Sequence, residues 1–86
     1  MTLLKNYTPR VIYDEEADVL YLKFASNKNA TAREIGTNII AYFDDLTGEP
    51  TTITIVYYKW LEEKGSSWRN DLPVQIDFEK DVRPYL

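Results

Sequence analysis

The stretch VIYDEEADVLYLKF, residues 11–24, decides the fold. β-Branched and aromatic residues lie on both sides of an acidic segment, residues 14–18, and this arrangement is typical of strand, turn and strand. In the second strand, Leu20 and Leu22 point to one face and Tyr21 to the other, because successive side chains of a strand alternate. The stretch therefore predicts a β-hairpin at which a sheet begins.

The same alternation of side chains recurs along the rest of the chain, separated by segments rich in Gly, Asn, Asp and Pro. The predicted strands cover about residues 10–14, 19–25, 31–35, 38–43, 51–56 and 73–78. Gly36 lies between the third and fourth strands, where a tight turn favours a residue that can adopt positive φ.

A change of period after residue 56 predicts a short helix over residues 57–64. Tyr57, Trp60 and Leu61 are spaced i, i+3 and i+4, and Gly65 then provides a stop signal. The alternative is that the fifth strand continues through Trp60, since alternate residues are also apolar there.

These elements predict an α+β fold: an antiparallel meander of four to five strands, one short helix after the fifth strand, and a C-terminal strand. We expect a single domain over residues 1–86, with the sheet at about 10–56 and the helix and C-terminal extension at 57–86. Both faces of the second and fourth strands carry apolar residues, so something must cover the second face. The helix, the C-terminal strand and another copy of the chain are the candidates.

Composition excludes several classes of function. The 86 residues include no cysteine and no histidine, which removes disulfides, thiol nucleophiles, histidine-based catalytic triads and the usual zinc ligands. The net charge of −4 disfavours binding to nucleic acid, which needs a basic face. No apolar run is as long as a signal peptide or a membrane span, so we expect a cytoplasmic protein that does not bind a membrane. We also expect no cofactor.

Two acidic segments are the candidates for chemistry. Asp14 and Asp18 are weak candidates for a divalent metal site, and the bland interpretation is that Asp14 caps the turn. A second acidic group, Asp44, Asp45 and Glu49, follows the fourth strand. Two carboxylates, one from each loop, could act as acid and base. A small carboxylate-based or metal-dependent enzyme is thus the alternative function.

Aromatic residues and one arginine are the candidates for an interaction surface, because Trp, Tyr and Arg anchor interfaces. We expect a partner or dimer surface that includes Tyr21, Tyr42, Tyr58, Trp60, Trp68 and Arg69. The alternative for these residues is that they fill the second face of their own sheet.

Three segments resemble the small prokaryotic family of uncharacterised proteins called DUF2283. They are YDEEADVLYL at 13–22, REIG at 33–36 and NIIA at 38–41, within a resemblance over about residues 11–56. Family members usually have Asp or Gly at the position of Thr37. The resemblance transfers no catalytic residue, and the genes that neighbour the family imply an antitoxin-like or partner-binding role.

The sequence thus favours a non-catalytic protein–protein interaction module. Its partner is expected to be a second copy of the chain or a small basic protein, since the chain is acidic and small for one core.

Overall fold

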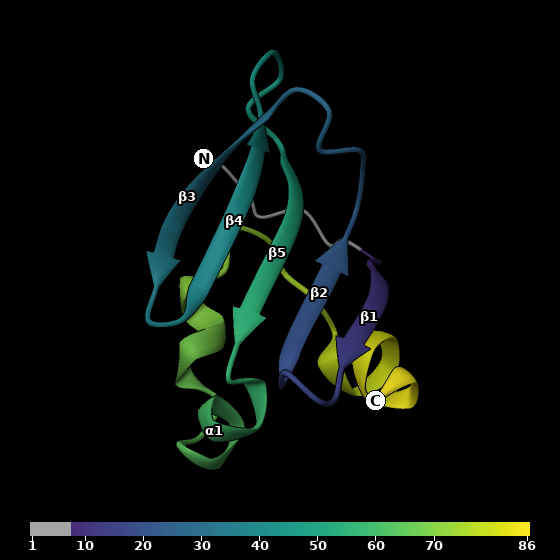
Figure 1. The fold of residues 1–86 in the computed structure, drawn as a ribbon, viewed down its shortest axis with the longest axis vertical. Coiled ribbons are helices and arrows are strands. Elements are labelled where there is room, and N and C mark those ends of the chain that lie inside the picture. Colours follow the sequence, from purple (N-terminus) through teal and green to yellow (C-terminus); the bar gives the residue numbers. More distant parts are fainter. Residues whose placement is uncertain (1–7) are drawn as a thin grey trace.

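The computed structural model describes residues 8–86, which form one five-stranded antiparallel sheet followed by short helical segments (Figure 1). The strands are β1 (Arg10–Asp14), β2 (Val19–Lys23), β3 (Ala30–Gly36), β4 (Ile39–Asp44) and β5 (Pro50–Val56). The helical segments are α1 (Tyr58–Glu63), the 3₁₀ helix η1 (Ser67–Asp71), the π-helix η2 (Phe78–Val82) and the 3₁₀ helix η3 (Arg83–Tyr85). The predicted antiparallel sheet is confirmed, and strands make up most of the regular secondary structure in the described residues.

The order of the strands differs from the predicted meander. Across the sheet the order is β1-β2-β5-β4-β3, so β2 pairs with β5 and Leu20 lies opposite Ile55. Only β3, β4 and β5 form a meander, and the connection from β2 passes over the end of the sheet to reach β3 (Figure 1). Strands β2–β5 therefore form a Greek key. Alternation in a sequence reports which face a side chain occupies, but not which strand lies beside it.

Asn27 fastens this long connection to the sheet. Its side-chain oxygen accepts hydrogen bonds from the hydroxyls of Thr51, at 2.6 Å, and Thr52, at 2.8 Å. Both threonines are buried, so the two hydrogen bonds satisfy polar groups that burial would otherwise penalise.

One face of the sheet carries the core. Leu20 and Leu22 of β2 pack there beside residues of β4 and β5, and all are fully buried. The segment from residue 58 onward covers this face. Figure 1 shows α1 and η1 near one end of β4 and β5, the C-terminal helical segments beside β1, and the chain between them passing behind the sheet. Its buried apolar side chains are Tyr58, Leu61, Trp68, Leu72, Val74, Phe78 and Val82.

The predicted C-terminal strand at 73–78 is wrong. Residues 73–77 contain a single bridge residue, Gln75, and Phe78 already begins η2. The side chain of Asp77 caps this segment by accepting a hydrogen bond from the backbone N–H of Lys80. Alternate residues are buried because an extended chain lies flat on the core, and that gives the same sequence pattern as a strand.

Strand β5 ends at Val56, and α1 begins at Tyr58. Tyr57 lies between them with φ 56°, in the left-handed region. The turn between β3 and β4 likewise takes its positive φ at Asn38, φ 62°, and not at Gly36 as we expected. Gly36 is close to another segment instead: a Cβ there would lie 3.1 Å from Oδ2 of Asp71.

Candidate interaction surface

The second face of the sheet has no described segment across it, and we call it the open face (Figure 1). Its apolar and aromatic side chains are Ile12, Val19, Tyr21, Ile40, Tyr42 and Val56. Ile12 is 37% exposed and the others are half-buried by their neighbours in the sheet. Water-facing strands of antiparallel sheets usually carry polar residues, so this face has the composition of a surface that is covered in use.

The strand register places these side chains in rows. Ile12 and Tyr21 are opposite each other across β1 and β2, and Tyr21 is opposite Thr54 of β5. Thr54 is in turn opposite Ile40 of β4. The row is therefore continuous across four strands, with the adjacent row contributing Tyr42.

Charged side chains on the open face are separated by sign. Arg10 and Lys23 are opposite each other on β1 and β2, and both are exposed. Glu34 on β3 and Asp44 on β4 occupy the other half of the sheet. Asp14 lies at the far end of β1 and is the exception to this separation.

Beyond the end of β5, a hollow of about 410 Å³ lies between Asn38, Tyr57 and Trp60. Tyr57 is 57% exposed and Trp60 45% exposed, and Nζ of Lys64 lies 4.5 Å from the Trp60 ring. A left-handed backbone at a bulky residue such as Tyr57 is strained, and such strain is found where a local structure serves a function.

The structure divides the predicted interaction residues between opposite sides of the sheet. Tyr21 and Tyr42 belong to the open face, and Trp60 lies on the adjoining exposed surface of α1. Tyr58 and Trp68 are each only 8% exposed and belong to the core. For these two residues the structure supports the alternative that they fill their own sheet's covered face.

The aromatic residues of the core form a chain of edge-to-face contacts. Tyr13 meets Tyr58 with ring centroids 5.8 Å apart, Tyr58 meets Trp68 at 6.2 Å, and Trp68 meets Phe78 at 5.5 Å. Burial is the main cause that raises the pKa of Tyr58 to about 12, and the nearby Glu62 carboxylate raises it further. This series of ring contacts links β1 to the C-terminal segment, and aromatic pairs of this geometry add stability beyond that of their burial.

Arg69 packs inside this C-terminal layer. Its guanidinium lies 4.2 Å from the Phe78 ring and 5.5 Å from the Trp68 ring, and its Nη2 donates to Oε1 of Glu62 at 2.7 Å. These contacts hold η1 against α1 and η2. Arg69 is therefore used within the chain, on the side away from Tyr21 and Tyr42.

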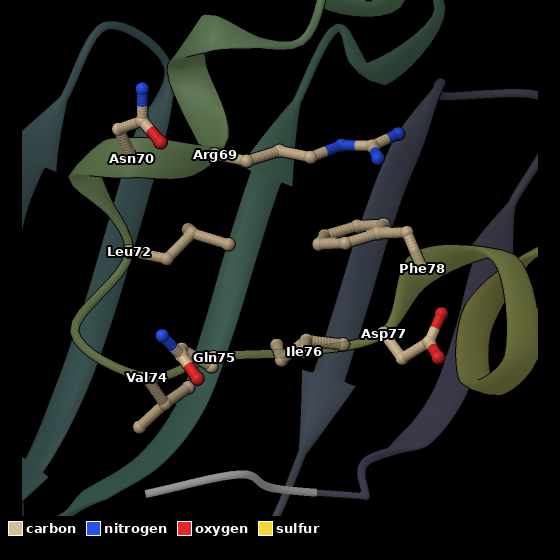
Figure 2. Close-up of a pocket in the computed structure, with 8 residues that line it drawn as sticks. All are labelled: Arg69, Asn70, Leu72, Val74, Gln75, Ile76, Asp77 and Phe78. Carbon is tan, nitrogen blue, oxygen red and sulfur yellow. The ribbon is translucent and has the colours of Figure 1, made fainter. Parts of the chain in front are cut away.

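A second hollow, of about 420 Å³, lies within residues 69–78 (Figure 2). Leu72 and Phe78 point toward each other across it, and Arg69 extends above Phe78. Its described walls come entirely from this one segment, with Asp77 already engaged in capping η2. The hollow presents no pair of groups arranged for acid–base chemistry.

The weak metal candidates Asp14 and Asp18 make local hydrogen bonds. Oδ1 of Asp14 accepts the backbone N–H of Ala17 at 3.1 Å, which is a turn cap. Asp18 accepts the Tyr13 hydroxyl at 2.7 Å and the backbone N–H of Lys59 at 3.1 and 3.2 Å. Within residues 8–86, no three acidic side chains gather as a metal site would require.

Asp18 thus connects the first turn to the start of α1, a role that sequence reasoning missed. Its backbone carbonyl also accepts the N–H of Tyr58. Burial is the first cause that raises the pKa of Tyr13 to about 12, and the hydrogen bond to Asp18 is the second. The positive φ of Asp18, 56°, is compatible with Asp, which tolerates this region better than most residues.

The two acidic loops lie at opposite ends of the sheet (Figure 1). The turn after β1 is beside the end of β5, where Val19 is opposite Val56, whereas Asp44 precedes the loop that leads into β5. The backbone N–H groups of Thr47 and Leu46 donate to Asp44 and lower the pKa of its carboxyl. The two loops therefore do not bring their carboxylates together, as the alternative acid–base interpretation would require.

The fold and the open face define a class of small, mainly β protein with one sheet face buried by its own C-terminal segment and the other face exposed. Residues 10–58 match the family described as "Protein of unknown function (DUF2283)". The chain belongs to this family, which confirms the resemblance in its first strands. Neither the curated proteins nor the solved structures include a match. The described part contains no helix with the length and apolar character needed to cross a membrane.

Proposed function

We propose that this protein is a non-catalytic protein–protein interaction module that binds its partner through the open face. One observation carries the proposal: a row of Ile12, Tyr21, Thr54 and Ile40, apolar except for Thr54, runs across four strands on a face that no described residue covers. The side chains in the corresponding row of the covered face, Leu20, Ile39 and Ile55, are fully buried.

The size of the face supports this role. Five strands about 4.8 Å apart give a width of roughly 24 Å, and strands of five to seven residues give a length of roughly 20 Å. The footprint is then about 500 Å² per partner before side-chain corrugation. Together with the exposed surface of Tyr57 and Trp60, this reaches the lower part of the range for specific protein interfaces.

The test places a photoreactive benzoylphenylalanine at Tyr21 and, as the control, at Tyr85, an exposed aromatic residue of η3. The full-length chain is produced in cells of its own source and irradiated, and the adducts are identified by mass spectrometry. We expect protein adducts from position 21 at several times the yield of position 85. Equal yields at the two positions contradict the proposed function.

A further inference from the structure

The open face has the dimensions, charge pattern and strained margin of a self-complementary surface. Resting on the proposed function above, we infer that its occupant is a second copy of this chain, packed face to face around a two-fold axis parallel to the strands. Two antiparallel sheets pack in this way in β-sandwiches, about 10 Å apart, with their strands nearly aligned.

The shape of the face favours another sheet. Tyr21 on β2 and Tyr42 on β4 are separated by the whole of β5, so the apolar surface is broad. A single helix, about 10 Å in diameter, covers only part of a face roughly 24 Å wide. A second open face has the same dimensions and covers both tyrosines at once.

The charges favour a second copy over a basic or an acidic partner. An axis parallel to the strands lays the half that contains β1 and β2 over the partner's half that contains β4 and β3. By the strand register, Arg10 then lies over Ala32 of the second copy, one residue pair, about 7 Å along the strand, from its Glu34. Lys23 lies over Tyr42 of the second copy, one residue pair from its Asp44. A uniformly basic partner matches the acidic half and repels the basic half, so the balanced face disfavours the basic partner expected from net charge alone.

Tyr57 supplies an independent argument. Its backbone is left-handed, a conformation that has a steric cost for any residue with a Cβ atom and none for glycine. The side chain is 57% exposed, so packing within the described chain offsets little of that cost. An exposed aromatic ring at the margin of the open face is explained if a second copy buries it.

The experiment measures the dimerisation constant of the purified full-length chain by sedimentation over about 1 µM to 1 mM. An interface at the lower end of the specific range predicts a dissociation constant in the micromolar region. A chain that stays monomeric over the whole range overturns the inference.

Charge reversal tests the arrangement of the two copies. Arg10→Glu and Glu34→Arg are each expected to weaken dimerisation about tenfold, because each creates two like-charge contacts across the axis. The double variant restores both attractions and is expected to return within about threefold of the unmodified chain. Arg10 and Glu34 are exposed on opposite edge strands of the same chain, so recovery reports a contact between chains. A double variant as weak as the single variants contradicts the two-fold arrangement.

Tyr57→Gly separates binding from folding. We expect this variant to unfold at the same temperature or higher, since the backbone strain is relieved, while its dimerisation weakens about tenfold. Asn38→Gly is the matched control, because Asn38 also has positive φ and lines the same hollow but contributes no aromatic ring. Equal dimerisation in Tyr57→Gly and Asn38→Gly contradicts the role of Tyr57.

Photocrosslinking from Tyr21 in the purified chain distinguishes the other occupants. A covalent dimer supports the inference, whereas a monomeric product joined to residues 1–7 shows that the chain's own N-terminal segment occupies the face and overturns it. If the purified chain is monomeric but Tyr21 forms adducts with a different protein in cells, the second copy is excluded and the proposed function stands. If position 21 gives no excess of adducts in either setting, both fail.

Discussion

Removing the carboxylate of Asp18 is expected to destabilise the protein by disconnecting the first hairpin from the start of α1. The side chain accepts the Tyr13 hydroxyl at 2.7 Å and the Lys59 backbone N–H at 3.1 and 3.2 Å. These three residues come from β1, the following turn and α1, so a single side chain fixes the relative positions of three segments.

The magnitude follows from two separable contributions. A hydrogen bond to a charged group contributes about 1.5–3 kcal/mol to stability. Because Asp18 is partly exposed, we expect its hydrogen bonds to Tyr13 and Lys59 to contribute about 2–3 kcal/mol together. A left-handed backbone at alanine costs about 1 kcal/mol more. The free energy of unfolding should therefore fall by about 3–4 kcal/mol in Asp18→Ala, by about 2–3 kcal/mol in Asp18→Gly, and by about 1 kcal/mol in Asp18→Asn.

The assay is urea unfolding followed by tryptophan fluorescence, with the m-value checked for constancy across the variants. Asp14→Ala is the control, because Asp14 makes one exposed hydrogen bond, to Ala17, within the same turn. Its expected cost is about 0.5–1 kcal/mol. A loss below 1 kcal/mol in Asp18→Ala, or a loss in Asp18→Gly no larger than that in Asp14→Ala, refutes the reasoning.

Three further predictions concern the core and the turns. Tyr13 and Tyr58, whose pKa values are raised to about 12 from the ordinary 10, favour the neutral phenol in the folded state, so stability should hold below pH 10 and fall between pH 10 and 12. When tyrosine ionisation is followed by absorbance at 295 nm, Tyr13→Phe and Tyr58→Phe should each remove one tyrosine that ionises above the ordinary pH. Ionisation of both tyrosines near pH 10 contradicts this. Val82→Ala should cost about 2 kcal/mol in urea unfolding because Val82 is fully buried, whereas Leu86→Ala, at a site 48% exposed, should cost under 0.5 kcal/mol; equal costs contradict a core role for η2. Asn38→Gly should change stability by less than 0.5 kcal/mol and Asn38→Val should reduce it by about 1–2 kcal/mol, since β-branched residues fit positive φ poorly; a Val variant as stable as the Gly variant is the contrary result.

Local pattern was sufficient to predict the strands of the sheet, and it was insufficient to predict their order. The alternation around Tyr21 assigns that side chain to one face whichever strand lies next to it. Pairing of β2 with β5 depends on contacts between residues 35 positions apart, such as Leu20 and Ile55, and no periodicity encodes them. The Greek key therefore followed only from the structure.

The candidate site was predicted in part, for a related reason. Aromatic composition identified Tyr21 and Tyr58 equally, but Tyr21 is on the open face and Tyr58 is in the core. The side on which Tyr58 lies is set by the end of β5 at Val56 and by the left-handed residue after it. A one-residue shift in that boundary exchanges the faces, which is finer than sequence patterns resolve.

The pairing of β2 with β5 also has a kinetic consequence for a chain emerging during synthesis. β2 can pair at once with β1, yet its other edge has no native neighbour until residues 50–56 have been made. During that interval the hairpin exposes the edge of β2 that β5 later covers, together with both apolar faces. Because distant pairings slow the search for the native state, we expect this small domain to fold in milliseconds to seconds, slower than a helical bundle of its length.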